Sequence, residues 1–176
     1  SDSNRGGGGL MPEFITLADG SLAVKGRNLL RDTQTTELES TDAGYLQTGL
    51  LPLAIDCKAL QGQNVAVSIQ CDCENAVAKT TSGHHRMGYE LDIGFEDGTA
   101  QYIGVWVRFS STPITVHSRF SETYTILNKP IKSATHSLIY LQHFTADSAK
   151  VSKPKLEFGT EATPYSPAPE DEEVTT

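Results

Sequence analysis

The sequence predicts an all-β protein, specifically a jelly-roll-type antiparallel β-sandwich. Hydrophobic and polar residues alternate with a period of two through most of the chain, which is typical of strands with one buried face. About eight such segments follow one another at regular spacing, with Gly, Asn and Pro between them. No segment carries an apolar stripe at helical spacing, and no internal repeat indicates a propeller or a solenoid.

The connections between the predicted strands are short, so neighbouring strands should be mainly antiparallel. We predict strands at residues 65–73, 88–95, 101–109, 114–116, 120–127, 137–144 and 151–158. Between the second and the third, Asp97-Gly98 supplies the positive φ angles of a tight hairpin turn. Residues 40–49 and residues 147–149 could each hold one helical turn.

At 176 residues the chain is long enough for one well-buried core and short for two. Residues 1–9 are expected to be a flexible linker or a cloning scar, because they contain four glycines in a row. Residues 10–26 form an extension with a small predicted hairpin around Asp19-Gly20. Residues 27–165 are the β-sandwich module, and residues 166–176 an acidic, proline-containing exit linker.

Composition excludes several function classes. The formal net charge of −8 argues against nucleic acid, whose recognition depends on clustered Lys and Arg. No apolar run approaches membrane-spanning length and no secretion signal precedes the domain, so we expect a soluble protein without membrane partners. Cys57, Cys71 and Cys73 are expected to be buried hydrophobes, consistent with a reducing site of synthesis. We predict neither a metal nor a cofactor.

The strand at residues 101–109 holds the main candidate site. One of its faces is uniformly apolar and should lie in the core, whereas the other presents Tyr102, Trp106 and Arg108. Gly104 is expected to leave the space above this second face open. The apolar C–H groups of a pyranose pack flat on aromatic rings, and its hydroxyls need donors such as a guanidinium. This face therefore suits a saccharide.

Two alternatives remain open for that face. A lone tryptophan such as Trp106 is more often a core residue than a ligand platform. The hairpin register bears on the choice, because a two-residue loop at Asp97-Gly98 would turn Trp106 toward the core. A three-residue loop with a bulge would instead place Glu90 and Asp92 beside Tyr102 and Trp106, which would make a sugar site.

The loop at residues 79–88 offers His85 and Arg86 as a polar rim for the binding site, although an ordinary solvated loop is the simpler interpretation. His117, His136 and His143 are scattered singly and are expected to be polar residues without a role as acid or base. No motif of a known enzyme class is present, and nothing distinguishes Glu90 and Asp92 from ordinary surface acids of a strand. We therefore predict no catalytic residue.

The last predicted strand and the segment that follows it have a distinctive sequence. Pro154-Lys155-Leu156-Glu157-Phe158-Gly159, followed by Ala162-Thr163 and Ser166-Pro167-Ala168-Pro169, closely resembles the closing signature of modules in tail and baseplate proteins of phages that infect Gram-positive bacteria. Residues 28–32, 117–126 and 137–142 resemble other parts of the same modules. Tyr165 stands where such modules often have Trp. The similarity covers about a third of the chain and not its ligand-bearing middle, so it does not identify a saccharide.

The resemblance implies a non-catalytic, jelly-roll carbohydrate-binding module of a distal tail, baseplate accessory or receptor-binding protein. Such a module would be made in the bacterial host cytoplasm and act at the tail tip of the virion. Its implied partners are host cell-wall polysaccharide and the other domains of a larger tail protein, and many copies on a virion would act together. The alternative is a structural spacer or docking domain of the tail that binds no saccharide.

Overall fold

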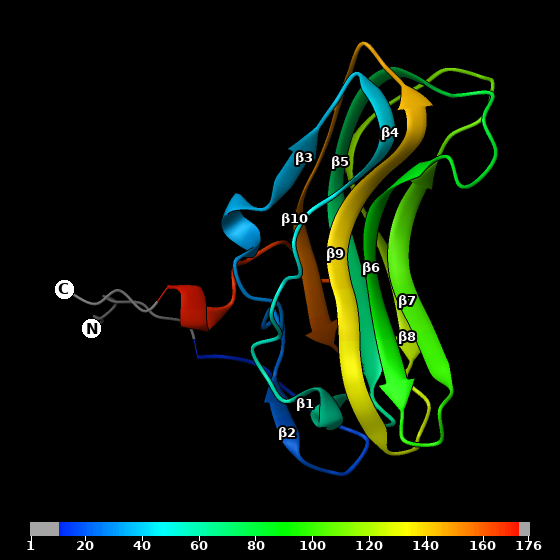
Figure 1. Ribbon diagram of the computed structural model, residues 1–176. Helices are drawn as coiled ribbons and strands as arrows, with labels where there is room; N and C mark the ends of the chain where they lie inside the picture. The colour runs from blue at the N-terminus through cyan, green and yellow to red at the C-terminus, as the bar shows by residue number, and fades with distance from the viewer. Residues whose placement is uncertain (1–10, 173–176) are drawn as a thin grey trace, which may run out of the picture.

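The computed structural model describes residues 11–172 and is built almost wholly of strands (Figure 1). The strands are β1 (Phe14–Thr16), β2 (Leu22–Val24), β3 (Glu37–Glu39), β4 (Asp42–Gln47), β5 (Asn64–Ala78), β6 (Arg86–Phe95), β7 (Ala100–Arg108), β8 (Ile114–Thr125), β9 (Ile131–Thr145) and β10 (Ser148–Phe158). Short 3-10 turns lie at Thr33–Thr35, Cys57–Leu60 and Pro169–Asp171. Nothing helical among the described residues has the length and apolar character that crossing a bilayer requires.

Two antiparallel layers form the sandwich, with strand orders β3-β10-β5-β8 and β4-β9-β6-β7. The end of β5 also pairs with β9, which joins the layers along one corner. From β3 to β10, the first strand pairs with the last, the second with the next to last, and so on inward to the β6–β7 hairpin. This is a long hairpin rolled up on itself, the topology of a jelly roll. The predicted fold class is confirmed.

The core lies between the layers and follows the predicted alternation. Along β6, Tyr89, Leu91 and Ile93 are fully buried, whereas the residues between them point to the outer face of the sheet. Cys71 and Cys73 of β5 lie in the same core, as predicted, and burial raises the pKa of the Cys71 thiol to about 12. These thiols therefore stay protonated and behave as small hydrophobic groups.

Three predictions of elements were wrong in detail, two of them at the edge strands β4 and β8, where neither face is uniformly buried. The segments predicted as 114–116 and 120–127 form one continuous strand, β8, because His117 to Arg119 keep their ladder with β5. The possible helical turn at 40–49 is the edge strand β4, paired with β9. Residues 148 and 149, predicted as part of a turn, begin β10. Edge strands such as β4 and β8 need no uniformly apolar face, so their sequences lack a clear alternation.

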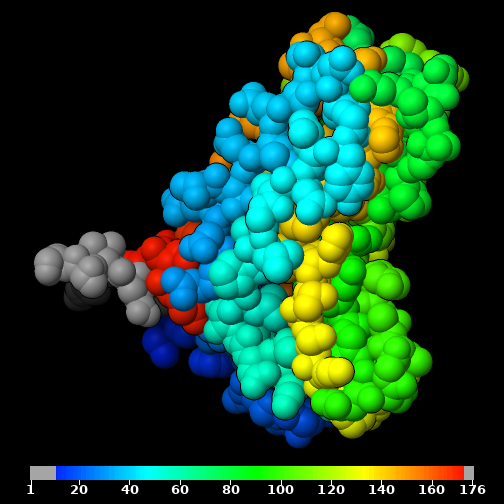
Figure 2. Space-filling view, viewed as in Figure 1, coloured from blue at the N-terminus to red at the C-terminus, as the bar shows by residue number. Residues whose placement is uncertain are grey.

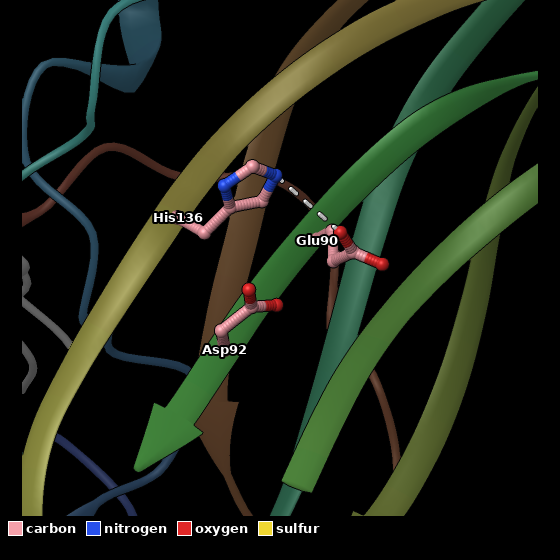
Figure 3. A group of neighbouring side chains, drawn as sticks. All are labelled: Glu90, Asp92 and His136. Carbon is pink, nitrogen blue, oxygen red and sulfur yellow. Dashed lines mark ion pairs between the residues drawn. The ribbon is translucent and has the colours of Figure 1, made fainter. Parts of the chain in front are cut away.

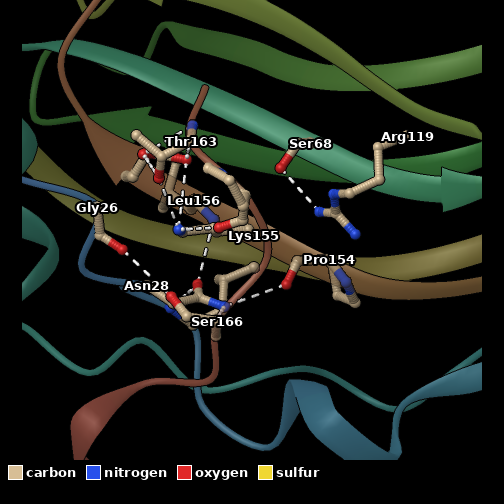
Figure 4. A network of polar contacts seen from close by, with 12 residues as sticks. Gly26, Asn28, Ser68, Arg119, Pro154, Lys155, Leu156, Thr163 and Ser166 are labelled. Carbon is tan, nitrogen blue, oxygen red and sulfur yellow. Dashed lines mark hydrogen bonds and ion pairs between the residues drawn. The ribbon is translucent and has the colours of Figure 1, made fainter. Parts of the chain in front are cut away.

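The chain after β10 packs back on the sandwich, although an exit linker was predicted from residue 166. Ala168 is fully buried, and Arg27 and Arg31 form ion pairs with Glu170 and Asp171. Asn28 donates from Nδ2 to the carbonyl oxygen of Ser166 at 3.0 Å (Figure 4). This segment, residues 162–172, is called the C-terminal strap below. It ties the end of the described chain to its beginning.

The strap is fastened over the outer face of β10 by a buried ion pair. Lys155 and Glu157 each expose only 1% of the side chain, and Lys155 Nζ lies 3.8 Å from a carboxylate oxygen of Glu157. Lys155 also donates to Thr163 Oγ1 and to the carbonyl oxygen of Pro164, both at 2.8 Å (Figure 4). The closing signature identified in the sequence is thus a structural fastening on one sheet, which leaves the outer face of the other sheet free of the strap.

Candidate functional site

The β6–β7 hairpin decides which residues share a face with Trp106. The N–H of Phe95 donates to the carbonyl oxygen of Thr99, and that of Gly98 donates to Phe95, so residues 96–98 form a three-residue loop. Gly98 has a φ of 88°, the left-handed conformation of the bulge in such loops. Of the two registers considered above, the structure has the one with the three-residue loop and bulge.

In this register Asp92 lies opposite Tyr102, Glu90 opposite Gly104, and Trp106 opposite Gly88. All of them occupy the outer face of the β4-β9-β6-β7 sheet, because their neighbours along β6 and β7 are in the core. Tyr102 exposes 62% of its surface and Arg108 is also exposed, whereas Trp106, Glu90 and Asp92 are half-buried. We call this surface, with Arg86 and the β9 residues beside it, the β6–β7 face.

One predicted residue lies apart from this group. His85 precedes β6, and its Nδ1 lies 2.7 Å from the carbonyl oxygen of His143. Its ring packs edge-on against the His143 ring, with 6.1 Å between centroids. Arg86, the next residue, belongs to the β6–β7 face and is largely buried. The loop therefore contributes Arg86 to the candidate site, whereas it places His85 against His143.

The indole of Trp106 lies over Gly104, so the expectation of open space above that glycine was wrong. A Cβ on Gly104 would come within 2.7 Å of Trp106 Cζ2 and within 2.4 Å of the carbonyl oxygen of Tyr89. Glycine is required here because the ring and the neighbouring backbone occupy the volume of any side chain. The Trp106 indole fills the space above Gly104 and lies along the sheet.

Two guanidinium groups stack on this tryptophan. The Cζ atoms of Arg86 and Arg108 lie 4.9 and 5.2 Å from the centroid of the Trp106 ring. Arg86 also lies 5.2 Å from the Tyr140 ring and donates from Nε to Gln142 Oε1 at 2.9 Å. Trp106 is therefore the ring that the guanidinium groups of Arg86 and Arg108 share in the stack. Tyr102 is the aromatic residue of β7 whose ring remains open to solvent.

Tyr140 and Gln142 of β9, and Tyr45 of β4, were not predicted as site residues. Tyr140 of β9 lies opposite Gly88 of β6, and Tyr45 of β4 lies opposite Gln142 of β9. The period-two pattern of residues 137–144 does place Tyr140 and Gln142 on one side of their strand. What the sequence did not provide was the strand order that sets β9 beside β6.

Unsatisfied polar atoms gather on this face. Five side-chain N or O atoms of the described residues are buried without a hydrogen-bond partner, and three of them are Asp92 Oδ1, Trp106 Nε1 and Tyr140 OH. Burial raises the pKa of the Tyr140 phenol, which therefore remains a proton donor. Leaving such a group unpaired costs about 1–3 kcal/mol, so ordered water or a ligand is the usual partner.

The carboxylates of the face meet a histidine that the sequence left unassigned (Figure 3). Glu90 Oε1 lies 3.6 Å from His136 Nε2, while Glu90 Oε2 lies 3.9 Å from Arg86 Nη2. The pKa of Asp92 is raised, first by burial and then by the negative charge of Glu90. The face thus offers ring surface, guanidinium donors and carboxylate acceptors within one patch.

The comparisons with known proteins give a likeness of fold. No protein-family model and no curated protein sequence matches the chain. Among solved structures, the chain is similar to a chain in the tripod (BppUct-A-L) from the baseplate of bacteriophage Tuc2009, with a TM-score of 0.51 and 15% sequence identity. The match covers 83% of this chain and 60% of the baseplate chain. At this identity the finding establishes a shared fold.

Proposed function

We propose that this chain is a non-catalytic carbohydrate-binding module of a phage tail protein, which adheres to host cell-wall polysaccharide during adsorption. The single observation that carries the proposal is the β6–β7 face, where Tyr102 is exposed opposite Asp92 and Arg108 is exposed opposite Arg86. The fold likeness to a baseplate tripod chain and the sequence resemblance described above support a place in the tail. The module would act at the tail tip of the virion.

The exposed members of the face are the ones that would contact a sugar. Tyr102 offers an open phenol ring for the C–H groups of a pyranose, and the Arg108 guanidinium offers donors for vicinal hydroxyls. Glu90 and Asp92 offer acceptors on the neighbouring strand. In this proposal Trp106 supports the site, because its ring stacks against the guanidinium groups of Arg86 and Arg108.

A structural spacer of the tail is the second candidate, and one observation favours it. The Arg86 guanidinium stacks on Trp106 and Tyr140 and already donates to Gln142, so this cation has its contacts without a ligand. A surface that only supports neighbouring domains needs no contacts to a ligand beyond these contacts within the chain. A spacer role does not explain why Tyr102 and Arg108 are exposed. Variants of these two residues therefore distinguish the two candidate functions.

The test is cell-wall staining by the fluorescently labelled chain, before and after chemical removal of wall polysaccharide from a panel of Gram-positive bacteria. We expect staining that depends on the polysaccharide and that falls about tenfold in Tyr102→Ala and Arg108→Ala, because truncating a central contact costs about 1–2 kcal/mol. Phe14→Ala is the matched control, since Phe14 is 56% exposed on the separate β1–β2 hairpin.

Both variants change exposed side chains, so they should fold as the parent chain does, which a thermal melt will check. A panel in which no wall is stained would refute adhesion and favour the spacer. Full staining by the folded Tyr102→Ala and Arg108→Ala variants would keep the function and remove this face as its site.

A further inference from the structure

Two strands bring a second kind of site together at the edge of the β6–β7 face. Glu90 and Asp92 of β6 and His136 of β9 each offer one ligand atom, and these atoms all lie within 4.8 Å of one another (Figure 3). We propose that Glu90, Asp92 and His136 form a binding site for a divalent transition-metal cation. The proposal does not depend on saccharide binding, although it shares two residues with the face described above.

The backbone is shaped to bring the imidazole to the carboxylates. Glu90 and Asp92 are two residues apart on β6 and so point to the same face. Opposite them, β9 is paired at Leu138 and then at Thr135, so it carries one extra residue. His136 lies in this bulge with a φ of 58°. A bulge re-aims a side chain, and here it turns His136 toward Glu90.

The electrostatics of the group favour a cation. Asp92 Oδ1 is buried and lacks any hydrogen-bond partner among the described residues. Burial, together with the charge of Glu90, also raises the pKa of the Asp92 carboxyl, as expected where two carboxylates converge. Arg86 faces Oε2 of Glu90 at 3.9 Å, which leaves Oε1 turned toward His136. A cation between the three groups would pair the orphaned oxygen and offset the repulsion.

The donor set indicates the class of metal. Two carboxylates and one imidazole suit Zn²⁺ or Mn²⁺ better than Ca²⁺, which prefers a shell of six to eight oxygen ligands. His136 also borders a hollow between β9 and the segment after β4. That hollow is lined by Leu50, Leu53, Thr135 and His136 among others. In Figure 2 the segment after β4, in cyan, runs beside β9, in yellow.

The other sheet provides a matched control with the same residue types. His117 of β8 contacts Asp72 through Nδ1 at 3.0 Å and Glu74 through Nε2 at 3.2 Å. The two carboxylates therefore contact different nitrogens of the imidazole ring, and these three groups do not converge as Glu90, Asp92 and His136 do. Substitutions in this group change a carboxylate or an imidazole without touching the proposed site.

The experiment is isothermal titration of the untagged full chain with ZnCl₂ and with MnCl₂, in the absence of saccharide. We expect one saturable site whose affinity falls at least tenfold in Asp92→Asn and in His136→Gln, and which is unchanged in Asp72→Asn and His117→Gln. The metal should also raise the melting temperature of the parent chain and of the control variants, but not of the two site variants.

Absence of saturable binding would overturn the proposal, as would binding that Asp92→Asn and His136→Gln leave intact. Ca²⁺ binding as tight as that of Zn²⁺ and Mn²⁺ would overturn the assignment to a transition metal. The thermal melts without metal show whether each variant is folded. Because no saccharide is present, failure of this test leaves the adhesion proposal standing, and failure of the staining test leaves the metal site standing.

Discussion

At the scale of single residues, the β6–β7 face depends on a glycine as much as on its aromatic rings. Gly104 lies beneath the Trp106 indole and beside the backbone of β6, where no side chain has room. Trp106 in turn stacks against two guanidinium groups, of which that of Arg108 is exposed. A change at this one backbone position should therefore disturb both stability and the face.

We predict that Gly104→Ala lowers the free energy of unfolding by about 2 kcal/mol or more, because the new methyl group would meet the Tyr89 carbonyl oxygen and the Trp106 ring. Urea denaturation, monitored through Trp106 fluorescence, measures this free energy of unfolding. Gly44→Ala is the control, since a Cβ on Gly44 meets nothing within 4 Å. Equal stability of the two variants would contradict the packing described for Trp106.

At the scale of elements, the C-terminal strap and β10 form one unit. The strap's contacts to Asn28, Arg27 and Arg31 join it to the beginning of the sandwich, and its contact to Lys155 joins it to β10. Lys155 is central because its ammonium group is buried with Glu157 and donates to two strap residues. Burial lowers its pKa, which Glu157 partly counteracts.

Lys155→Met should destabilise the fold by about 3 kcal/mol or more, because it leaves the Glu157 carboxylate buried without a cation. The double variant Lys155→Met/Glu157→Gln should recover part of that loss, since it removes the uncompensated charge. Urea denaturation at neutral pH gives both values, with Lys132→Met on the exposed side of β9 as the control. A loss as small as that of Lys132→Met would mean that the pair does not fasten the strap.

At the scale of the whole molecule, the two outer faces of the sandwich differ in how far they are covered. The strap is bonded over β10, where the polar side chains Lys155 and Glu157 are buried, whereas the β6–β7 face carries exposed Tyr102 and Arg108. One outer face is thus covered by the strap, and the other leaves these two side chains open to solvent. Single exposed sites of this size bind saccharides weakly, so adhesion would draw on many copies of the module.

We therefore predict that the chain tetramerised on streptavidin adheres to polysaccharide-bearing cell walls at least about a hundredfold more strongly than the monomer. The comparison uses the same biotinylated protein in both forms and measures the concentration at half-maximal staining. A tetramer of Tyr102→Ala separates specific avidity from non-specific adhesion. Equal half-maximal concentrations for the monomer and the tetramer would contradict the multivalent mechanism.

The sequence by itself determined the β-sandwich, because alternation with a period of two is a local property that survives in any arrangement of strands. It also placed Tyr102, Trp106 and Arg108 on one side of their strand, and it marked the closing signature. It failed at the edge strands β4 and β8, where neither side is uniformly buried and the pattern fades.

Only the tertiary structure decided which residues of different strands meet. The loop of residues 96–98 set the register that faces Asp92 with Tyr102, a choice that the sequence left open by one residue. The pairing of β9 with β6 brought Tyr140 and Gln142 to the face, and a single bulged residue turned His136 toward Glu90. Such contacts depend on strand order and on bulges, which arise from long-range packing that local patterns do not encode.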